Sequence, residues 1–182
     1  MSEWRKELTE KYPYLMPHNA FTGKVPYDYD YSYIEGEYNL PGGWFLLFLQ
    51  MCDDIRKPLE ESGQINEFRF LQVKEKYGSM RCYTSGATTD VLDIISKYEF
   101  LSQQVCSVCG KPASVLTSGY ICPYCAEHVR GGMETVVDSE RIIPQTEFTR
   151  ITFKDGNKVQ TIISVKTEWE RYLERITINN DK

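Results

Sequence analysis

The chain has 182 residues and a mass of 21.2 kDa, which suits one domain or one domain with a small metal-binding module. Hydrophobic residues make up 41% of it and charged residues 26%, and these proportions exclude a wholly disordered chain. The formal net charge of -5 arises within residues 1–66, which hold 6 Lys and Arg against 11 Asp and Glu. This acidic balance excludes a generally basic protein that binds nucleic acid by releasing counterions.

The sequence predicts a protein of the cytoplasm that has no membrane partner. Its longest unbroken apolar run, residues 44–49, is too short to cross a bilayer. Residues 1–8 contain no apolar stretch followed by a small-residue cleavage site, so we expect no export.

Residues 1–40 are irregular and rich in tyrosine, with a short helix predicted before Pro13. Residues 25–34 then alternate aromatic and polar side chains, which predicts a strand with tyrosines on one face and aspartates on the other. The candidate partner-binding residues of this strand are Tyr27, Asp28, Tyr29 and Asp30. Two interpretations stay open. The acidic stretch over residues 27–37 imitates a phosphate backbone and inhibits a host protein, or it is a solvated loop whose tyrosines lie against the core.

A long amphipathic helix is predicted after the Pro-Gly-Gly sequence of residues 41–43. Its apolar side chains recur at helical spacing: Trp44, Leu47, Phe48, Met51, Ile55 and Leu59. Pro58 should kink or end this helix, and Gly63 lies at a natural stop.

A β-hairpin and a second helix follow. Apolar and polar residues alternate over residues 68–73, and residues 80–84 form the returning strand. The turn lies at residues 76–79, where Gly78 can adopt a positive φ. Thr88 or Thr89 should cap the next helix. The apolar stripe of that helix comprises Val91, Leu92, Ile95, Tyr98 and Leu101.

Charged residues gather at the end of this hairpin. Lys74, Lys76 and Arg81 lie around Tyr77 in the predicted strands. One interpretation is that these charges pair across the strands in solvent while the apolar residues pack inward. The other is a recognition site in which the cations hold a phosphate or an acidic partner and the ring of Tyr77 stacks on it.

Four of the six cysteines form two Cys-x-x-Cys pairs separated by twelve residues: Cys106, Cys109, Cys122 and Cys125. Two such knuckles joined by a hairpin complete a tetrahedral thiolate shell, so the spacing predicts one structural zinc ion per chain. Gly110 permits the left-handed turn that the first knuckle needs. Four thiolates leave no position for water, which argues against a catalytic metal.

Other cysteine chemistry is less favoured. Two disulfides would need an oxidising compartment, for which the sequence gives no sign. Cys52 and Cys82 fall in apolar patterns and are expected to be small buried side chains. His128, three residues after Cys125, could replace a cysteine as a ligand, but with four sulfurs present we favour the four-cysteine set.

A second hairpin and a final helix are predicted near the end of the chain. Residues 149–153 and 158–165 flank an Asp-Gly-Asn turn, and Thr167 should cap the helix that follows. The predicted fold is α+β: a small antiparallel sheet with packed helices, an inserted zinc ribbon and a C-terminal β-hairpin plus helix. The expected division is a body over residues 1–104, the ribbon over 105–130, and the hairpin and helix over 131–182, packed on the body.

The order of these motifs carries a resemblance. A Gly-Trp pair opens an apolar helix, residues 72–83 read Q-V-K-E-K-Y-G-S-M-R-C-Y, and a Cys-x-x-Cys-Gly knuckle follows another helix. This order resembles an uncharacterised family of small bacteriophage and prophage proteins, whose central segment usually reads close to Q-V-K-E-K-F-G-x-L-R-F-Y. Three positions depart from that pattern: Tyr77, Met80 and Cys82. The match covers about residues 40–126, and it implies phage origin, host cytoplasm and a zinc ribbon but no reaction.

We therefore expect a non-catalytic, zinc-stabilised phage protein that binds a host or phage macromolecule. In one version of this hypothesis the protein inhibits a host defence protein. A protein partner is favoured, and the oligomeric state stays open. The alternative is a nucleic-acid-associated accessory protein that uses Lys74, Lys76 and Arg81. A metal-dependent nuclease is less favoured, because Gln72 stands where the (D/E)-x-K pattern needs an acid. The upstream candidates for a second carboxylate do not fit either: Asp53 and Asp54 lie in a predicted helix, and Glu67 is too near on the same strand. We expect no enzyme.

Overall fold

The computed structural model describes residues 3–16, 18, 22, 24–25, 40–130, 135–136 and 145–180. Residues 26–34 of the predicted strand, and with them Tyr27, Asp28, Tyr29 and Asp30, lie outside the described residues. Helices pack with small antiparallel sheets, which confirms the predicted α+β class. None of the helices in the described part of the chain has the length and apolarity that a bilayer crossing requires.

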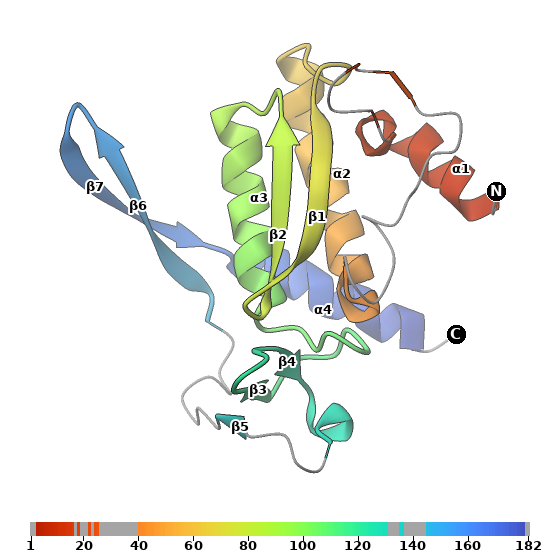
Figure 1. The fold of residues 1–182 in the computed structure, drawn as a ribbon, viewed down its shortest axis with the longest axis vertical. Coiled ribbons are helices and arrows are strands. Elements are labelled where there is room, and N and C mark those ends of the chain that lie inside the picture. Colours follow the sequence, from red (N-terminus) through yellow and green to blue (C-terminus); the bar gives the residue numbers. More distant parts are fainter. Residues whose placement is uncertain are drawn as a thin grey trace.

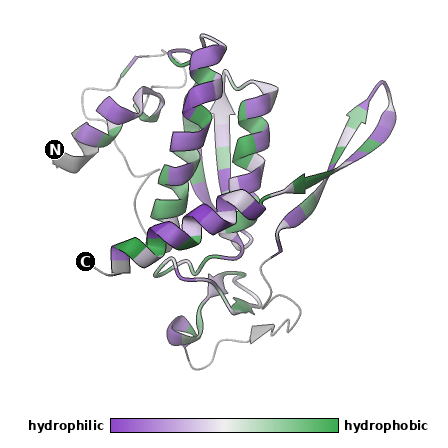
Figure 2. Cartoon of the chain, turned by 180° about the vertical axis from the view of Figure 1, so that it is seen from behind, coloured by the Kyte–Doolittle hydropathy of each residue, from purple (hydrophilic) through white to green (hydrophobic). Residues whose placement is uncertain are grey.

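The body consists of helices packed behind one antiparallel hairpin (Figure 1). In chain order its elements are α1 (Glu3–Lys11), two short 3-10 helices (Pro13–Leu15 and Gly42–Trp44), α2 (Phe45–Glu61), β1 (Arg69–Lys76), β2 (Ser79–Ser85) and α3 (Thr89–Ser102). Helices α2 and α3 run side by side, and α4 (Lys166–Asn180) crosses their ends nearest the ribbon (Figures 1 and 2).

Helix α2 supplies the centre of the core. The six apolar residues predicted for its stripe are completely buried: Trp44, Leu47, Phe48, Met51, Ile55 and Leu59. Cys52 is also buried, as expected, whereas Cys82 packs against this core but stays partly exposed. The helix continues three residues beyond Pro58, because a proline that begins the last turn removes only one backbone hydrogen bond.

The β1–β2 hairpin turns through Tyr77 and Gly78, whose φ angles are 53° and 77°, as the two-residue type I′ turn requires. Helix α3 covers the outer edge of β2. The Cys82 N–H donates to Glu99 Oε1 at 2.7 Å, and the Met80 N–H donates to Ser102 Oγ at 2.7 Å. These bonds satisfy edge groups that a two-stranded sheet leaves open.

Strands β6 (Glu147–Lys154) and β7 (Asn157–Ser164) form the predicted second hairpin, which projects from the body (Figure 1). The predicted cap of the last helix is wrong: α4 begins at Lys166, so Thr167 lies within the helix. Burial of Val165 fixes the start, and its carbonyl accepts the Trp169 N–H at 3.0 Å. Trp169 and Tyr172 then anchor α4 in the core.

Candidate metal centre

The ribbon follows α3 and is built from very short elements. Strand β3 (Val115–Thr117) pairs antiparallel with β4 (Pro123–Tyr124) and with β5 (Thr135–Val136), and a 3-10 turn (Ala126–His128) follows the second cysteine pair. The Thr117 N–H donates to the Cys122 carbonyl at 3.1 Å, and the Cys122 N–H donates to Thr117 Oγ1 at 3.0 Å. These bonds close the tip of the ribbon, residues 117–122.

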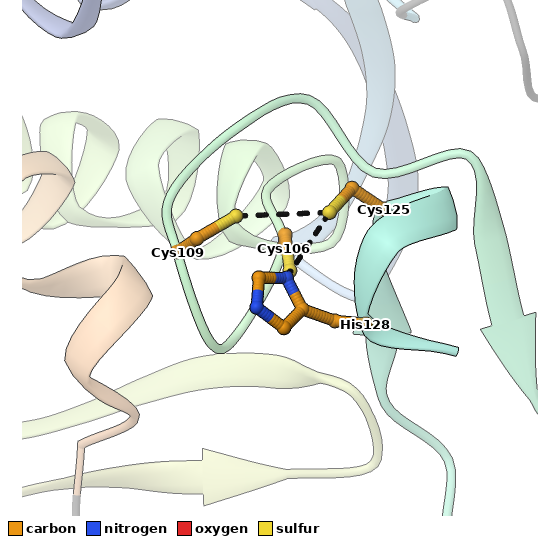
Figure 3. Close-up of side chains that lie close together, drawn as sticks. All are labelled: Cys106, Cys109, Cys125 and His128. Carbon is orange, nitrogen blue, oxygen red and sulfur yellow. Dashed lines mark hydrogen bonds between the residues drawn. The ribbon is translucent and has the colours of Figure 1, made fainter. Parts of the chain in front are cut away.

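Three cysteines and one histidine converge at the base of this ribbon (Figure 3). The ligand atoms of Cys106, Cys109, Cys125 and His128 all lie within 4.8 Å of one another. Cys109 Sγ is 3.7 Å from Cys125 Sγ, and His128 Nδ1 is 3.2 Å from Cys125 Sγ and 3.7 Å from Cys106 Sγ. This cluster can hold a metal ion.

The separations between the ligand atoms match those of a tetrahedral site. With metal–sulfur bonds of about 2.3 Å, two sulfurs of a tetrahedron lie about 3.8 Å apart, and a sulfur and a nitrogen lie slightly closer. A disulfide would bring two sulfurs to about 2.05 Å. All six cysteines lie in the described part of the chain, and each is present as a free thiol.

The backbone around the first knuckle prepares Cys106 for ionisation. Burial opposes its ionisation, but the backbone N–H groups of Cys125, Cys109 and Val108 donate to its sulfur and together lower its pKa. Burial, with the neighbouring sulfurs, raises the pKa of Cys109 to about 11. Three thiolates this close together repel one another. A divalent metal ion bound between them would stabilise their ionised form.

The fourth predicted ligand differs from the residue found in the cluster. Cys122 is buried but does not belong to the group of four ligand atoms, and His128 occupies the remaining position. Burial raises the pKa of the Cys122 thiol, and hydrogen bonds with the side chains of Ser107 and Tyr124 partly offset this. Cys122 and His128 both line a pocket of about 660 Å³ beside the cluster. The turn over residues 126–128, closed by the His128 N–H to the Cys125 carbonyl at 3.0 Å, directs the imidazole inward.

The first knuckle is fixed directly to the core of the body. The Gly43 N–H donates to the Ser107 carbonyl at 2.9 Å, and the Trp44 Nε1–H donates to the Val105 carbonyl at 2.8 Å. From α4, the Tyr172 hydroxyl donates to the Gly110 carbonyl at 2.6 Å. These three hydrogen bonds therefore attach the candidate metal-binding cluster to the core of the body.

The candidate residues of the β1–β2 hairpin separate into two groups. Arg81 pairs with Glu99 of α3 at 3.2 Å, so its partner lies on the helix and not on the opposite strand, where the register places Lys74. Lys76 Nζ lies 5.6 Å from the ring centroid of Tyr77, which is 76% exposed. Lys74 Nζ lies 5.2 Å from the ring centroid of Tyr83.

The structure adds a residue to this group that the sequence did not indicate. Tyr120, at the tip of the ribbon, is 69% exposed and donates its hydroxyl to Glu75 Oε2 at 3.0 Å. The tip and the β1–β2 turn line a groove of about 400 Å³. We call it the turn groove; its lining residues are Lys74, Glu75, Lys76, Tyr77, Gly119, Tyr120 and Ile121. Arg81 does not line this groove. Glu75 and Tyr120 are 45 residues apart in the chain, so no local sequence pattern could predict their contact.

The aspartates considered for a nuclease have other partners. Asp53 accepts the Tyr12 hydroxyl at 2.5 Å and pairs with Lys11 at 3.0 Å. Asp54 accepts the Tyr98 hydroxyl at 2.5 Å and pairs with Arg171. Both carboxylates thus connect α2 to neighbouring elements.

Comparison with known proteins found no match to a protein-family model, a curated protein or a solved structure. The resemblance to small phage proteins stays a prediction from the sequence.

Proposed function

We propose that this chain is a non-catalytic protein-binding module, in which a structural zinc ion holds one wall of the turn groove in place. The observation that carries the proposal is the position of the ribbon tip. Its Tyr120 meets Glu75 of β1, and the segment that bears it lies between Cys109 and Cys125 in the chain. A metal ion held by those cysteines would fix both ends of the segment.

Zinc is the metal that best fits the donors. Three thiolates and one imidazole are soft and borderline ligands, and their tetrahedral spacing is the one that zinc adopts at structural sites. Four protein ligands would fill its coordination shell and leave no position for water or substrate. The proposed role of the ion is therefore to stabilise the ribbon.

The chemistry of the turn groove favours an acidic protein segment as its ligand. Tyr77 and Tyr120 expose large rigid rings, the kind of side chain that dominates binding energy at interfaces. Lys74 and Lys76 supply positive charge, while Glu75 is already bonded to the Gly78 N–H at 2.7 Å and to Tyr120. Carboxylates of a partner would meet the two lysines, and the charges would raise the association rate. Following the phage resemblance, we propose a host protein of the cytoplasm as this partner, which the chain would inhibit by occupying its surface.

Affinity capture from a bacterial lysate should detect this partner. We expect the wild-type chain to retain a protein that Tyr77→Ala and Tyr120→Ala each lose, because each substitution removes an anchor ring. Lys74→Glu with Lys76→Glu should slow association more strongly at low salt than at high salt. Leu92→Ala, at an exposed apolar position on α3 outside the turn groove, is the control and should retain the partner. All variants should keep their stability within about 0.5 kcal/mol.

Treating the lysate with a nuclease separates the two candidate classes of partner. Retention that survives the treatment supports a protein ligand. Retention that disappears would favour the nucleic-acid alternative. If all three variants, Tyr77→Ala, Tyr120→Ala and Leu92→Ala, retain the partner equally, the turn groove is not its binding site.

A further inference from the structure

The β6–β7 hairpin carries large apolar side chains that the body leaves uncovered. Its base is fixed to α3: the Phe148 and Phe100 rings stack with centroids 4.8 Å apart, and Arg150 pairs with Asp93. The rest projects away from the body (Figure 1), and hydrophobic residues continue along it (Figure 2). Phe153 and Ile162 are 75% and 71% exposed. Side chains this exposed contribute little to the packing of the body.

The strand register assigns the side chains of the hairpin to two faces. Phe148 and Arg150 share the inner face, which turns toward α3 at the base of the hairpin. The opposite face, here the outer face, carries side chains that point away from α3. Its residues are Glu147, Thr149, Ile151 and Phe153 from β6 and Lys158, Gln160, Ile162 and Ser164 from β7. Ile151, Phe153 and Ile162 form an apolar stripe along it.

An isolated two-stranded hairpin is marginally stable in water, and a stable one normally has a third strand or a packed face. Beyond its base, this hairpin has neither within the described part of the chain. Its apolar stripe and unpaired strand edges are features that soluble proteins usually cover or protect with charge. A protein surface laid on the outer face would supply the missing layer.

We propose that a second copy of this chain covers the outer face, with the two hairpins stacked antiparallel about a two-fold axis. The distribution of charge on the face supports this occupant. Glu147 lies at the base and Lys158 at the tip, so an antiparallel stack brings each Lys158 toward the Glu147 of the other copy. The face is thus complementary to itself, as a two-fold interface requires. The turn groove shares no residue with it, so each proposal can fail alone.

The size of the outer face predicts a weak dimer. Eight residues per strand give a face about 26 Å long and only two strands wide. This area is well below the ~800 Å² per partner of a standard interface. We expect a reversible dimer with a dissociation constant on the order of tens of micromolar.

Sedimentation equilibrium of the full chain over a range of concentrations tests the proposal. The wild-type chain should pass from monomer to dimer as its concentration rises. Phe153→Ser and Ile162→Ser should each raise the dissociation constant about tenfold or more, because each removes about 1.4 kcal/mol or more of apolar contact. Val159→Ser changes an exposed apolar residue on the inner face and should leave the dimer intact. A wild-type chain that stays monomeric throughout overturns the proposal, even if another protein binds the hairpin.

Charge exchange tests the antiparallel arrangement without changing the apolar stripe. Glu147→Lys alone and Lys158→Glu alone should each weaken the dimer, since each places like charges together. The double variant should recover the wild-type dissociation constant. A double variant no stronger than the single variants, or a dimer unaffected by Phe153→Ser and Ile162→Ser, would exclude this interface.

Discussion

Removing the metal with a strong chelator should unfold the ribbon, residues 105–130, and lower the melting temperature of the whole chain. The ribbon strands have only three and two residues at β3 and β4, too few to fold alone. Structural zinc typically contributes about 10–16 kcal/mol of apparent binding free energy, which is comparable to the entire stability of a domain. Because Gly43, Trp44 and Tyr172 hold the first knuckle, the loss should reach the core.

Thermal unfolding and amide hydrogen exchange would measure this effect. Chelation should lower protection in residues 105–130 first, and next at the start of α2 and around Tyr172 of α4, where these helices contact the knuckle. The same chelator saturated with zinc beforehand is the control, and added zinc should restore the original melting temperature. Unchanged melting and unchanged exchange in the metal-free chain would show that no ion supports this fold.

Gly43→Ala should be among the most damaging single substitutions in the protein. A Cβ atom at this position would lie 2.2 Å from the Cys106 carbonyl oxygen, 2.7 Å from the Gly110 nitrogen and 2.7 Å from the Ser107 carbonyl carbon. These are backbone atoms of the knuckle, so they can move only by displacing the cysteine ligands. We expect a loss of about 3 kcal/mol or more in the free energy of unfolding, together with weaker metal binding.

The neighbouring glycine provides a matched control. A Cβ atom at Gly42 would meet no atom within 4 Å, so Gly42→Ala should change stability by about 0.5 kcal/mol or less. Urea unfolding and zinc-competition titration of both variants would measure the difference. Equal stability and equal zinc affinity in the two variants would contradict the close contact between this segment and the knuckle.

Local patterns predicted the elements whose geometry is local. The stripe of α2 follows from helical spacing, and both two-residue turns follow from a glycine at the second position, with Tyr77 and Asp155 at positive φ before it. The start of α4 was mispredicted because Thr167 is a good cap in isolation. Burial of Val165 against the body decided the start instead.

The details of the candidate sites depend on tertiary contacts, which the spacing of residues along the sequence does not predict. Cys125-x-x-His128 has the same spacing as Cys122-x-x-Cys125, so the sequence admits either residue as the fourth ligand. The choice depends on the turn after Cys125 and on the bonds that hold Cys122 to Thr117. Tyr120 joins the turn groove through a tertiary contact, and the approach of Gly43 to the knuckle is likewise invisible in the sequence.

The zinc content of three purified variants tests the candidate metal centre most directly. For the proposed set of three cysteines and His128, we predict that Cys122→Ser keeps about one zinc ion per chain with nearly wild-type affinity. We predict that His128→Ala binds zinc at least tenfold more weakly, and that Cys109→Ser, which removes a ligand common to both candidate sets, also loses zinc and stability. Zinc lost from Cys122→Ser but retained by His128→Ala would contradict the proposed ligands and restore the four-cysteine set.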